Sequence, residues 1–145
     1  MKVFTIGSNA KSLRRFAELL KGVGVDCVID IRLNNTSQLA GYAKRDDLAF
    51  ALELLGIGYE HHPKLAPNDE ILAAYRQDKD WDAYVEGFSR LIVERDMLSV
   101  GRDILSRYER PCLLCSEDTP ERCHRRLVAE HWALHIPEVE VEHLT

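Results

Sequence analysis

The segment from Cys115 to Arg125, CSEDTPERCHR, gathers two thiols, an imidazole, guanidinium groups and carboxylates into a short stretch of chain. Within it, Thr119 and Pro120 predict the start of a helix, since Thr is a good N-cap and Pro suits the first helical position. The first turns of such a helix have free N–H groups and a dipole that favours anions. We therefore expect Cys123 and His124 to lie at an anion-favouring helix terminus.

The side chains of this segment suggest two catalytic roles. Glu117 or His124 would transfer protons, because carboxylates and imidazoles are the usual acids and bases in enzymes. Cys123 would act as a nucleophile if the helix terminus, Arg122 and Arg126 lowered the pKa of its thiol. The alternative interpretations of Cys123 are a packed thiol and a thiol that merely faces an anion.

The same segment also allows a metal site, which we keep as an alternative. Cys115, Cys123 and His124 have the soft and borderline donor atoms that zinc and similar ions prefer. His61 or His62 could complete the site, because both lie at the carboxyl end of a predicted strand, at the same edge of the sheet. The spacing of seven residues between the two cysteines is not that of a standard zinc knuckle.

Asp30 and Arg32 flank Ile31 at the end of an apolar run, and a spacing of two residues points both side chains to the same side of a strand. Arg32 could grip an anion with two N–H groups while Asp30 holds the guanidinium in place. A structural ion pair that anchors the following loop is the alternative. Ser116 and Arg125 complete the predicted ligand-binding set.

The elements that must position these residues alternate between strands and helices. The pattern predicts a mostly parallel sheet covered by helices on both faces, a three-layer α/β domain spanning residues 1–145. Ligands of such sheets bind beyond the carboxyl ends of the strands. The predicted strands are 3–6, 25–31, 57–61, 112–115 and 139–144. The predicted helices begin near Ser12, Arg45, Asn68, Trp81 and Thr119, and one more helix passes through Ile104. Residues 33–44 are predicted to form a loop.

Composition restricts the function classes. With 145 residues, 46% hydrophobic and 30% charged, the chain is typical of a globular protein with one core. There is no apolar run long enough to span a bilayer and no signal-peptide pattern, so we expect a cytoplasmic protein that does not bind membranes. The net charge of −5 disfavours a general nucleic-acid coat. Nucleic acid or protein binding through Arg122, Arg125 and Arg126 stays open.

The remaining cysteines and histidines have plainer interpretations. In the absence of a secretion signal, the four cysteines are expected to be reduced. Cys112 lies three residues before Cys115 in a predicted strand, so the two side chains should face opposite sides of the sheet, with Cys112 a buried and inert core residue. His131 and His135 are interpreted as packed or boundary residues of the last helix.

Nearly the whole chain resembles the bacterial and archaeal family known as domain of unknown function 488. The resemblance rests on FTIG at Phe4–Gly7, VIDIRLNNTSQLAGYAK at Val28–Lys44, KLAP at Lys64–Pro67 and LLCSEDTPERCHRRLVAEHW at Leu113–Trp132. It implies a compact α/β fold and a shared polar site, and the family name records that no activity is established. The positions carried over by motif are Arg32, Cys115, Glu117, Cys123, His124 and Arg125.

The sequence thus predicts a small-anion or nucleotide-phosphate site at the carboxyl edge of the sheet. In this hypothesis Arg32 and Arg125 bind charge, and Glu117 or His124 transfers protons. The metal site and the non-catalytic interaction module remain the alternatives. No cofactor, substrate or reaction is identified by the sequence itself.

Overall fold

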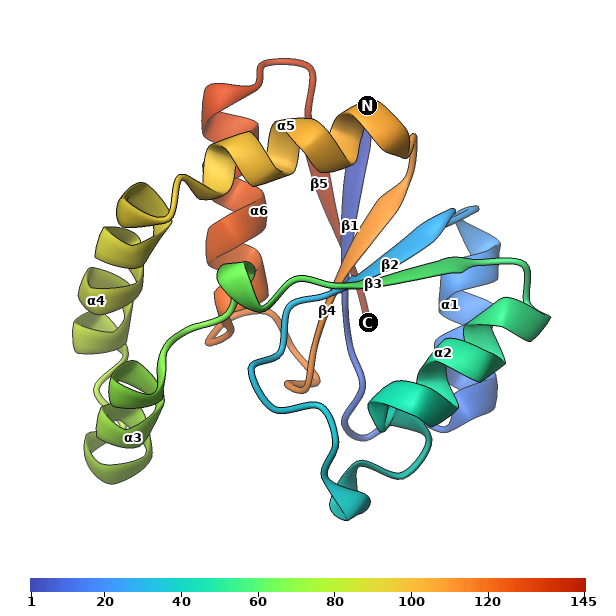
Figure 1. The fold of residues 1–145 in the computed structure, drawn as a ribbon, viewed down its shortest axis with the longest axis horizontal. Coiled ribbons are helices and arrows are strands. Elements are labelled where there is room, and N and C mark those ends of the chain that lie inside the picture. Colours follow the sequence, from blue (N-terminus) through green and yellow to red (C-terminus); the bar gives the residue numbers. More distant parts are fainter.

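A computed structural model, which describes residues 1–145, contains one sheet of five parallel strands (Figure 1). The strand order is β3-β2-β4-β1-β5, so the first and fourth strands of the chain pair in the centre. Parallel pairing requires a crossover connection between strands, and helices supply each of them. The strands are β1 Lys2–Gly7, β2 Cys27–Asp30, β3 Gly58–His61, β4 Pro111–Cys115 and β5 Glu140–Leu144.

Helices cover both faces of the sheet, as predicted (Figure 1). On one face, α1 and α2 pack against the side chains of β1, β2 and β4 that point toward them. On the other face lie α4, α5 and α6, while α3 packs mainly on α4. The helices are α1 Leu13–Gly22, α2 Arg45–Leu54, α3 Asp69–Asp78, α4 Trp81–Glu94, α5 Met97–Arg107 and α6 His124–His135. None of them is long and apolar enough to cross a membrane.

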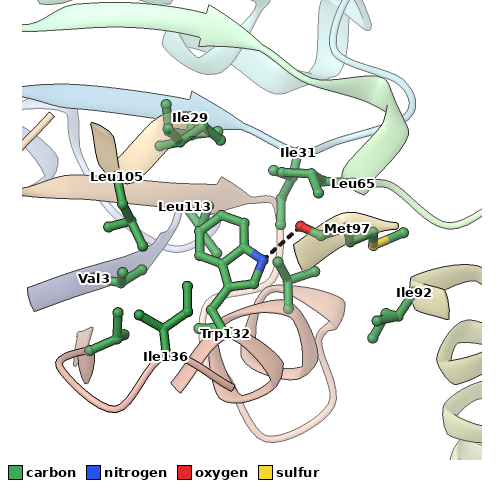
Figure 2. Close-up of a cluster of buried hydrophobic side chains, with 14 of the residues drawn as sticks. Val3, Ile29, Ile31, Leu65, Ile92, Met97, Leu105, Leu113, Trp132 and Ile136 are labelled. Atoms are coloured by element: carbon green, nitrogen blue, oxygen red, sulfur yellow. Dashed lines mark hydrogen bonds between the residues drawn. The ribbon is translucent and has the colours of Figure 1, made fainter. Parts of the chain in front are cut away.

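Trp132 anchors α6, the helix that follows the chemically rich segment (Figure 2). Its indole ring is fully buried among apolar side chains of the sheet and of α5, and its Nε1–H donates to the carbonyl of Met97 at 3.0 Å. The indole lies directly against Gly101 of α5, where an added Cβ would come within 2.4 Å of the ring. The position of α6 relative to the sheet is therefore set by close packing.

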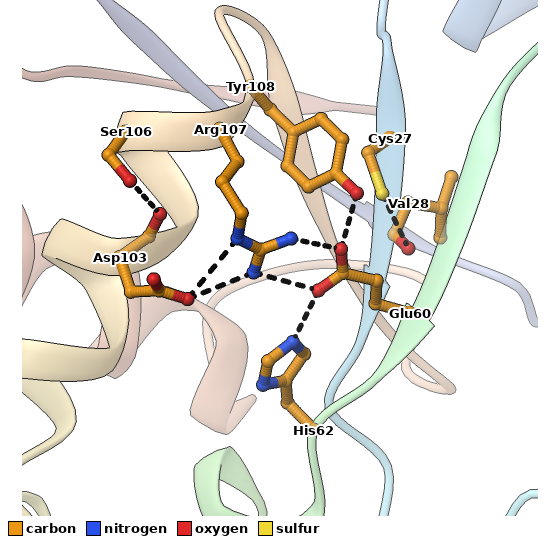
Figure 3. Close-up of polar contacts among 8 residues, drawn as sticks. All are labelled: Cys27, Val28, Glu60, His62, Asp103, Ser106, Arg107 and Tyr108. Carbon is orange, nitrogen blue, oxygen red and sulfur yellow. Dashed lines mark hydrogen bonds and ion pairs between the residues drawn. The ribbon is translucent and has the colours of Figure 1, made fainter.

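Glu60 ties the edge strand β3 to the end of α5 (Figure 3). Its carboxylate accepts hydrogen bonds from Arg107, from the Tyr108 hydroxyl and from the ring of His62. Arg107 also pairs with Asp103 one turn earlier in α5. The guanidinium of Arg107, together with the other two donors, lowers the pKa of Glu60 from its ordinary 4.5 to about 2. This cluster fastens the edge strand β3 to the C-terminal end of α5.

Two local predictions are wrong. The last helix begins at His124 instead of Thr119, and residues 116–123 form an irregular loop. The carbonyls of Glu117 and Asp118 are held by the buried guanidinium of Arg125, so tertiary hydrogen bonds override the local capping preference. The predicted loop at 33–44 contains a short 3-10 helix, Gln38–Ala43, capped by the Ser37 hydroxyl.

Candidate functional site

A cavity of about 290 Å³ opens beyond the carboxyl ends of β2 and β4. These neighbouring strands lead to helices on opposite faces of the sheet, β2 to α2 and β4 to α6. Such a switch point leaves a crevice in which α/β proteins bind their ligands. The cavity is lined by Arg32, Leu33, Asn34, Pro67, Leu72, Tyr75, Arg76, Lys79, Tyr84, Cys115, Ser116, Glu117, Arg122, Cys123 and His124.

Arg32 enters this cavity from a buried ion pair with Asp30. Its Nε and Nη2 donate to the two carboxylate oxygens at 2.8 and 2.7 Å, and its backbone N–H donates to Oδ1 at 3.1 Å. Asn35 and the Tyr59 hydroxyl also donate to Asp30. Burial alone would raise the pKa of Asp30, but the guanidinium and these hydrogen bonds outweigh it and lower the pKa below its ordinary 3.8. The pair is therefore charged and fixed in orientation.

Cys115 and Cys123 meet at the floor of the cavity, where they form a disulfide. One cysteine ends β4 and the other is the N-cap residue of α6, so the return of the chain after the loop brings them together. The prediction of reduced cysteines is wrong for this pair, because it rests on the lack of a secretion signal, which does not exclude a disulfide between two cysteines that the fold brings into contact. It is confirmed for Cys27 and Cys112, which are free and buried.

His124 lies beside the two sulfur atoms and is 8% exposed. Its Nε2 is 2.7 Å from the carbonyl oxygen of Ile31, which can only accept, so Nε2 carries the proton. Burial, together with the charge of Arg125, lowers the pKa of His124 to about 4 although the bond to Ile31 opposes this. The imidazole is neutral at pH 7, and Nδ1 keeps a free lone pair.

Arg125 points away from the cavity and into the protein. It is fully buried and donates to the Cys115 sulfur at 3.0 Å, to the carbonyl oxygens of Glu117 and Asp118 at 2.6 and 3.3 Å, and to the Thr5 hydroxyl at 3.3 Å. The guanidinium shapes the loop after β4 from behind. Because its side chain has no exposed surface, Arg125 is not available to an external partner, unlike Arg122.

The outer wall of the cavity comes from α3 and α4, which the sequence analysis did not connect with the site. Arg76 and Lys79 extend from the end of α3, and the rings of Tyr75 and Tyr84 lie 5.3 Å apart between them and the sheet. The only local signal for this role is that α3 has no buried residue, which leaves its side chains free for another task. Proximity to the strand ends depends on tertiary packing.

The predicted site residues divide into two groups. Those that line the common cavity are Arg32, Cys115, Ser116, Glu117, Cys123 and His124. Arg125 lies behind its floor, and His61 and His62, at the carboxyl end of β3, lie outside it. His61 is bonded to the carbonyl of Arg32 at 2.9 Å, and His62 is bonded to Glu60 at 2.8 Å.

Comparison with known proteins places this arrangement in a family. Residues 12–132 match the model of the family described as domain of unknown function DUF488, and the chain belongs to that family. Neither a curated protein nor a solved structure matches the chain. The match confirms the resemblance seen in the sequence, and the family description assigns no activity.

Proposed function

We propose that the cavity at the carboxyl ends of β2 and β4 binds a small anionic ligand, of which a phosphate on a small cyclic group is the best fit. Four cationic side chains line the cavity, namely Arg32, Arg76, Lys79 and Arg122, against a single carboxylate at Glu117. None of Arg76, Lys79 and Arg122 forms a salt bridge within the chain. Their charge is thus available to a ligand.

Arg32 gives this proposal its strongest support. The residue is only 4% exposed, and Asp30 occupies its Nε and Nη2, yet Nη1 has no partner within the protein. Nη1 is not among the fully buried side-chain atoms that lack a hydrogen-bond partner, so it is accessible, and it faces the opening of the cavity. A guanidinium held by a carboxylate from behind, with donors free in front, is pre-organised for an anion.

The apolar part of the lining favours a ligand with a flat hydrophobic portion. Tyr75, Tyr84, Leu72 and Pro67 form this part of the wall. A volume of about 290 Å³ is at the lower end of the range usual for small-molecule sites. A mononucleotide or a similar phosphorylated ring combines the required charge, flatness and size.

The predicted proton-transfer roles of Glu117 and His124 belong to this proposal as well. Both side chains line the cavity, and His124 presents an unprotonated Nδ1 at neutral pH. A neutral imidazole beside a bound anion can accept a proton from it or from water. A nucleophilic role for Cys123 requires the reduced thiol.

Thermal unfolding tests the proposal. Inorganic phosphate and adenosine monophosphate, each compared with chloride at equal ionic strength, should raise the melting temperature, because a ligand of the native state stabilises it. At a ligand concentration of 100 times Kd the gain is about 2.7 kcal/mol. A larger effect of the nucleotide than of phosphate would support the contribution of the tyrosine wall.

Matched variants locate the effect. Arg122→Gln removes a cation of the cavity, whereas Arg14→Gln removes an exposed cation of α1, on the opposite face of the sheet. We expect the first to weaken the ligand-induced shift and the second to leave it unchanged. The absence of a shift in the wild type, or an equal loss in both variants, would show that the cavity does not bind these anions.

A further inference from the structure

The floor of the cavity contains a cluster of metal-ligating atoms. The sulfur atoms of Cys115 and Cys123 and a ring nitrogen of His124 all lie within 4.8 Å of one another, and all three residues are buried. In a tetrahedral zinc site, bonds of about 2.3 Å to sulfur and about 2.0 Å to nitrogen keep donor atoms about 3.5–3.8 Å apart. To share one ion, the widest sulfur–nitrogen pair would have to contract by up to about 1.3 Å, and the two sulfur atoms, once their disulfide is reduced, would have to move apart to about 3.8 Å.

His124 is already oriented as metal-bound histidines are. Nε2 donates to the carbonyl oxygen of Ile31 at 2.7 Å, so the nitrogen that remains free is Nδ1. A hydrogen bond from the second ring nitrogen to a backbone carbonyl fixes the tautomer and the ring plane of a metal ligand. Arg125 similarly donates to the Cys115 sulfur at 3.0 Å, and this type of contact stabilises a thiolate.

The backbone spacing of the cysteines also suits two thiolates on a shared ion. Their Cα atoms are 7.6 Å apart, beyond the separation of about 4.4–6.8 Å that is usual for bridged cysteines. Sulfur atoms that share a metal are about 3.8 Å apart, which accommodates a longer backbone separation. The reduced pair is thus compatible with the observed positions of β4 and α6.

The two thiolates can balance the positive charge that the ion would add beside the nearby arginines. Arg32, Arg122 and Arg125 would repel a bare cation at this position. Two thiolates neutralise a divalent ion completely, and the hydrogen bond from Arg125 to Cys115 can persist beside the metal–sulfur bond. Sulfur and nitrogen donors would favour a thiophilic ion over Mg²⁺ or Ca²⁺, which prefer oxygen donors.

We propose that the reduced form of this protein binds one zinc-class divalent ion through Cys115 Sγ, Cys123 Sγ and His124 Nδ1. Two S–H bonds are replaced by two sulfur–metal bonds, and the two protons pass to the solvent. Because all three ligands line the cavity, the fourth coordination position faces it, as in catalytic rather than structural zinc sites. The inference does not rest on anion binding, which involves Arg32 and the cations of the outer wall.

Cobalt substitution gives a direct test on the full chain. The protein is reduced with a phosphine until four thiols per chain are counted after denaturation, and it is then titrated with Co²⁺ or Zn²⁺ alone. We expect one equivalent per chain, a thiolate-to-cobalt charge-transfer band and the visible bands of a tetrahedral ion. X-ray absorption of the zinc form should give two sulfur neighbours at about 2.3 Å and at least one nitrogen neighbour at about 2.0–2.1 Å.

Variants assign the ligands. Cys123→Ser and His124→Gln should each weaken binding at least about 100-fold, more than the loss of a typical outer-shell partner. The matched control is the double change His131→Gln and His135→Gln. These two histidines lie next to each other further along α6, and neither is as buried as His124. The double change should leave the stoichiometry and the spectrum unchanged.

Three results would overturn the proposal. They are uptake well below one equivalent by the fully reduced wild type, absorption spectra without sulfur neighbours, and loss of binding in the His131 and His135 control. The spectra of the wild type decide the question even if a ligand variant does not fold. Phosphate-induced stabilisation is measured in the presence of a chelator, so that the test of anion binding does not depend on whether the metal site exists.

Discussion

Gly7 occupies a position at which a single methyl group should displace the loop after β4. It ends β1 beside Cys115, and an added Cβ would lie 1.5 Å from the carbonyl oxygen of Glu117. Since non-bonded carbon contacts are comfortable only near 3.5 Å, the loop of Gly7→Ala must move by about 1.5–2 Å. The shift would break the hydrogen bond of 2.6 Å from Arg125 to Glu117 and strain that of 2.9 Å from Asn9 N–H to the Ser116 carbonyl.

The expected loss of stability follows from these contacts. A hydrogen bond to a charged group contributes about 1.5–3 kcal/mol and a neutral one about 1 kcal/mol, so we expect Gly7→Ala to lower the free energy of unfolding by about 2.5–4 kcal/mol. For a chain of this size the melting temperature would fall by about 10 °C. The intrinsic conformational preference of the two residues alone predicts a gain in stability for Gly7→Ala, because Gly in a strand interior is less favourable than Ala.

Urea denaturation followed by circular dichroism measures this difference, with Gly22→Ala as the control. Gly22 ends α1, and an added Cβ there meets no atom within 4 Å. The control should match the wild type or exceed its stability by up to about 1 kcal/mol. A free energy of unfolding for Gly7→Ala within about 1 kcal/mol of the wild type would refute the reasoning from close contact.

Two further predictions concern groups outside the cavity. Burial raises the pKa of the Cys27 thiol to about 11 and raises that of Cys112 further. Both thiols should therefore react with a thiol reagent only when the protein unfolds. Rapid labelling of Cys112 in the folded protein would contradict its place in the core. The carboxylate of Glu60 has a folded pKa of about 2 against an ordinary 4.5, so the stability it contributes is complete above pH 4.5 and is lost as the pH falls toward 2. Glu60→Gln should flatten the pH dependence of the free energy of unfolding in that window, and an unchanged slope would mean that the bridge to Arg107 does not hold β3.

The sequence determined the architecture because its signals are local and repeated. Apolar runs separated by amphipathic helices predict a parallel sheet covered on both faces, and all five strands lie within a few residues of their predicted positions. The spacing of Asp30 and Arg32 also indicated that the two would pair, and they do, although β2 ends at Asp30 and Arg32 lies two residues beyond its end. In the same way, the odd spacing of Cys112 and Cys115 placed one thiol in the core and the other at the cavity.

The tertiary structure alone decided how the site is assembled. Arg125 looks like an anion-binding residue in the sequence, but packing turns it inward to four acceptors on β1, β4 and the following loop. Arg76 and Lys79 carry no motif, and they reach the cavity only because α3 packs against α4 beyond the strand ends. The contact between Cys115 and Cys123 likewise depends on where the chain turns back into α6. Periodicity determines which face of an element is buried, but the distance between side chains on different elements is set by packing among residues far apart in the chain.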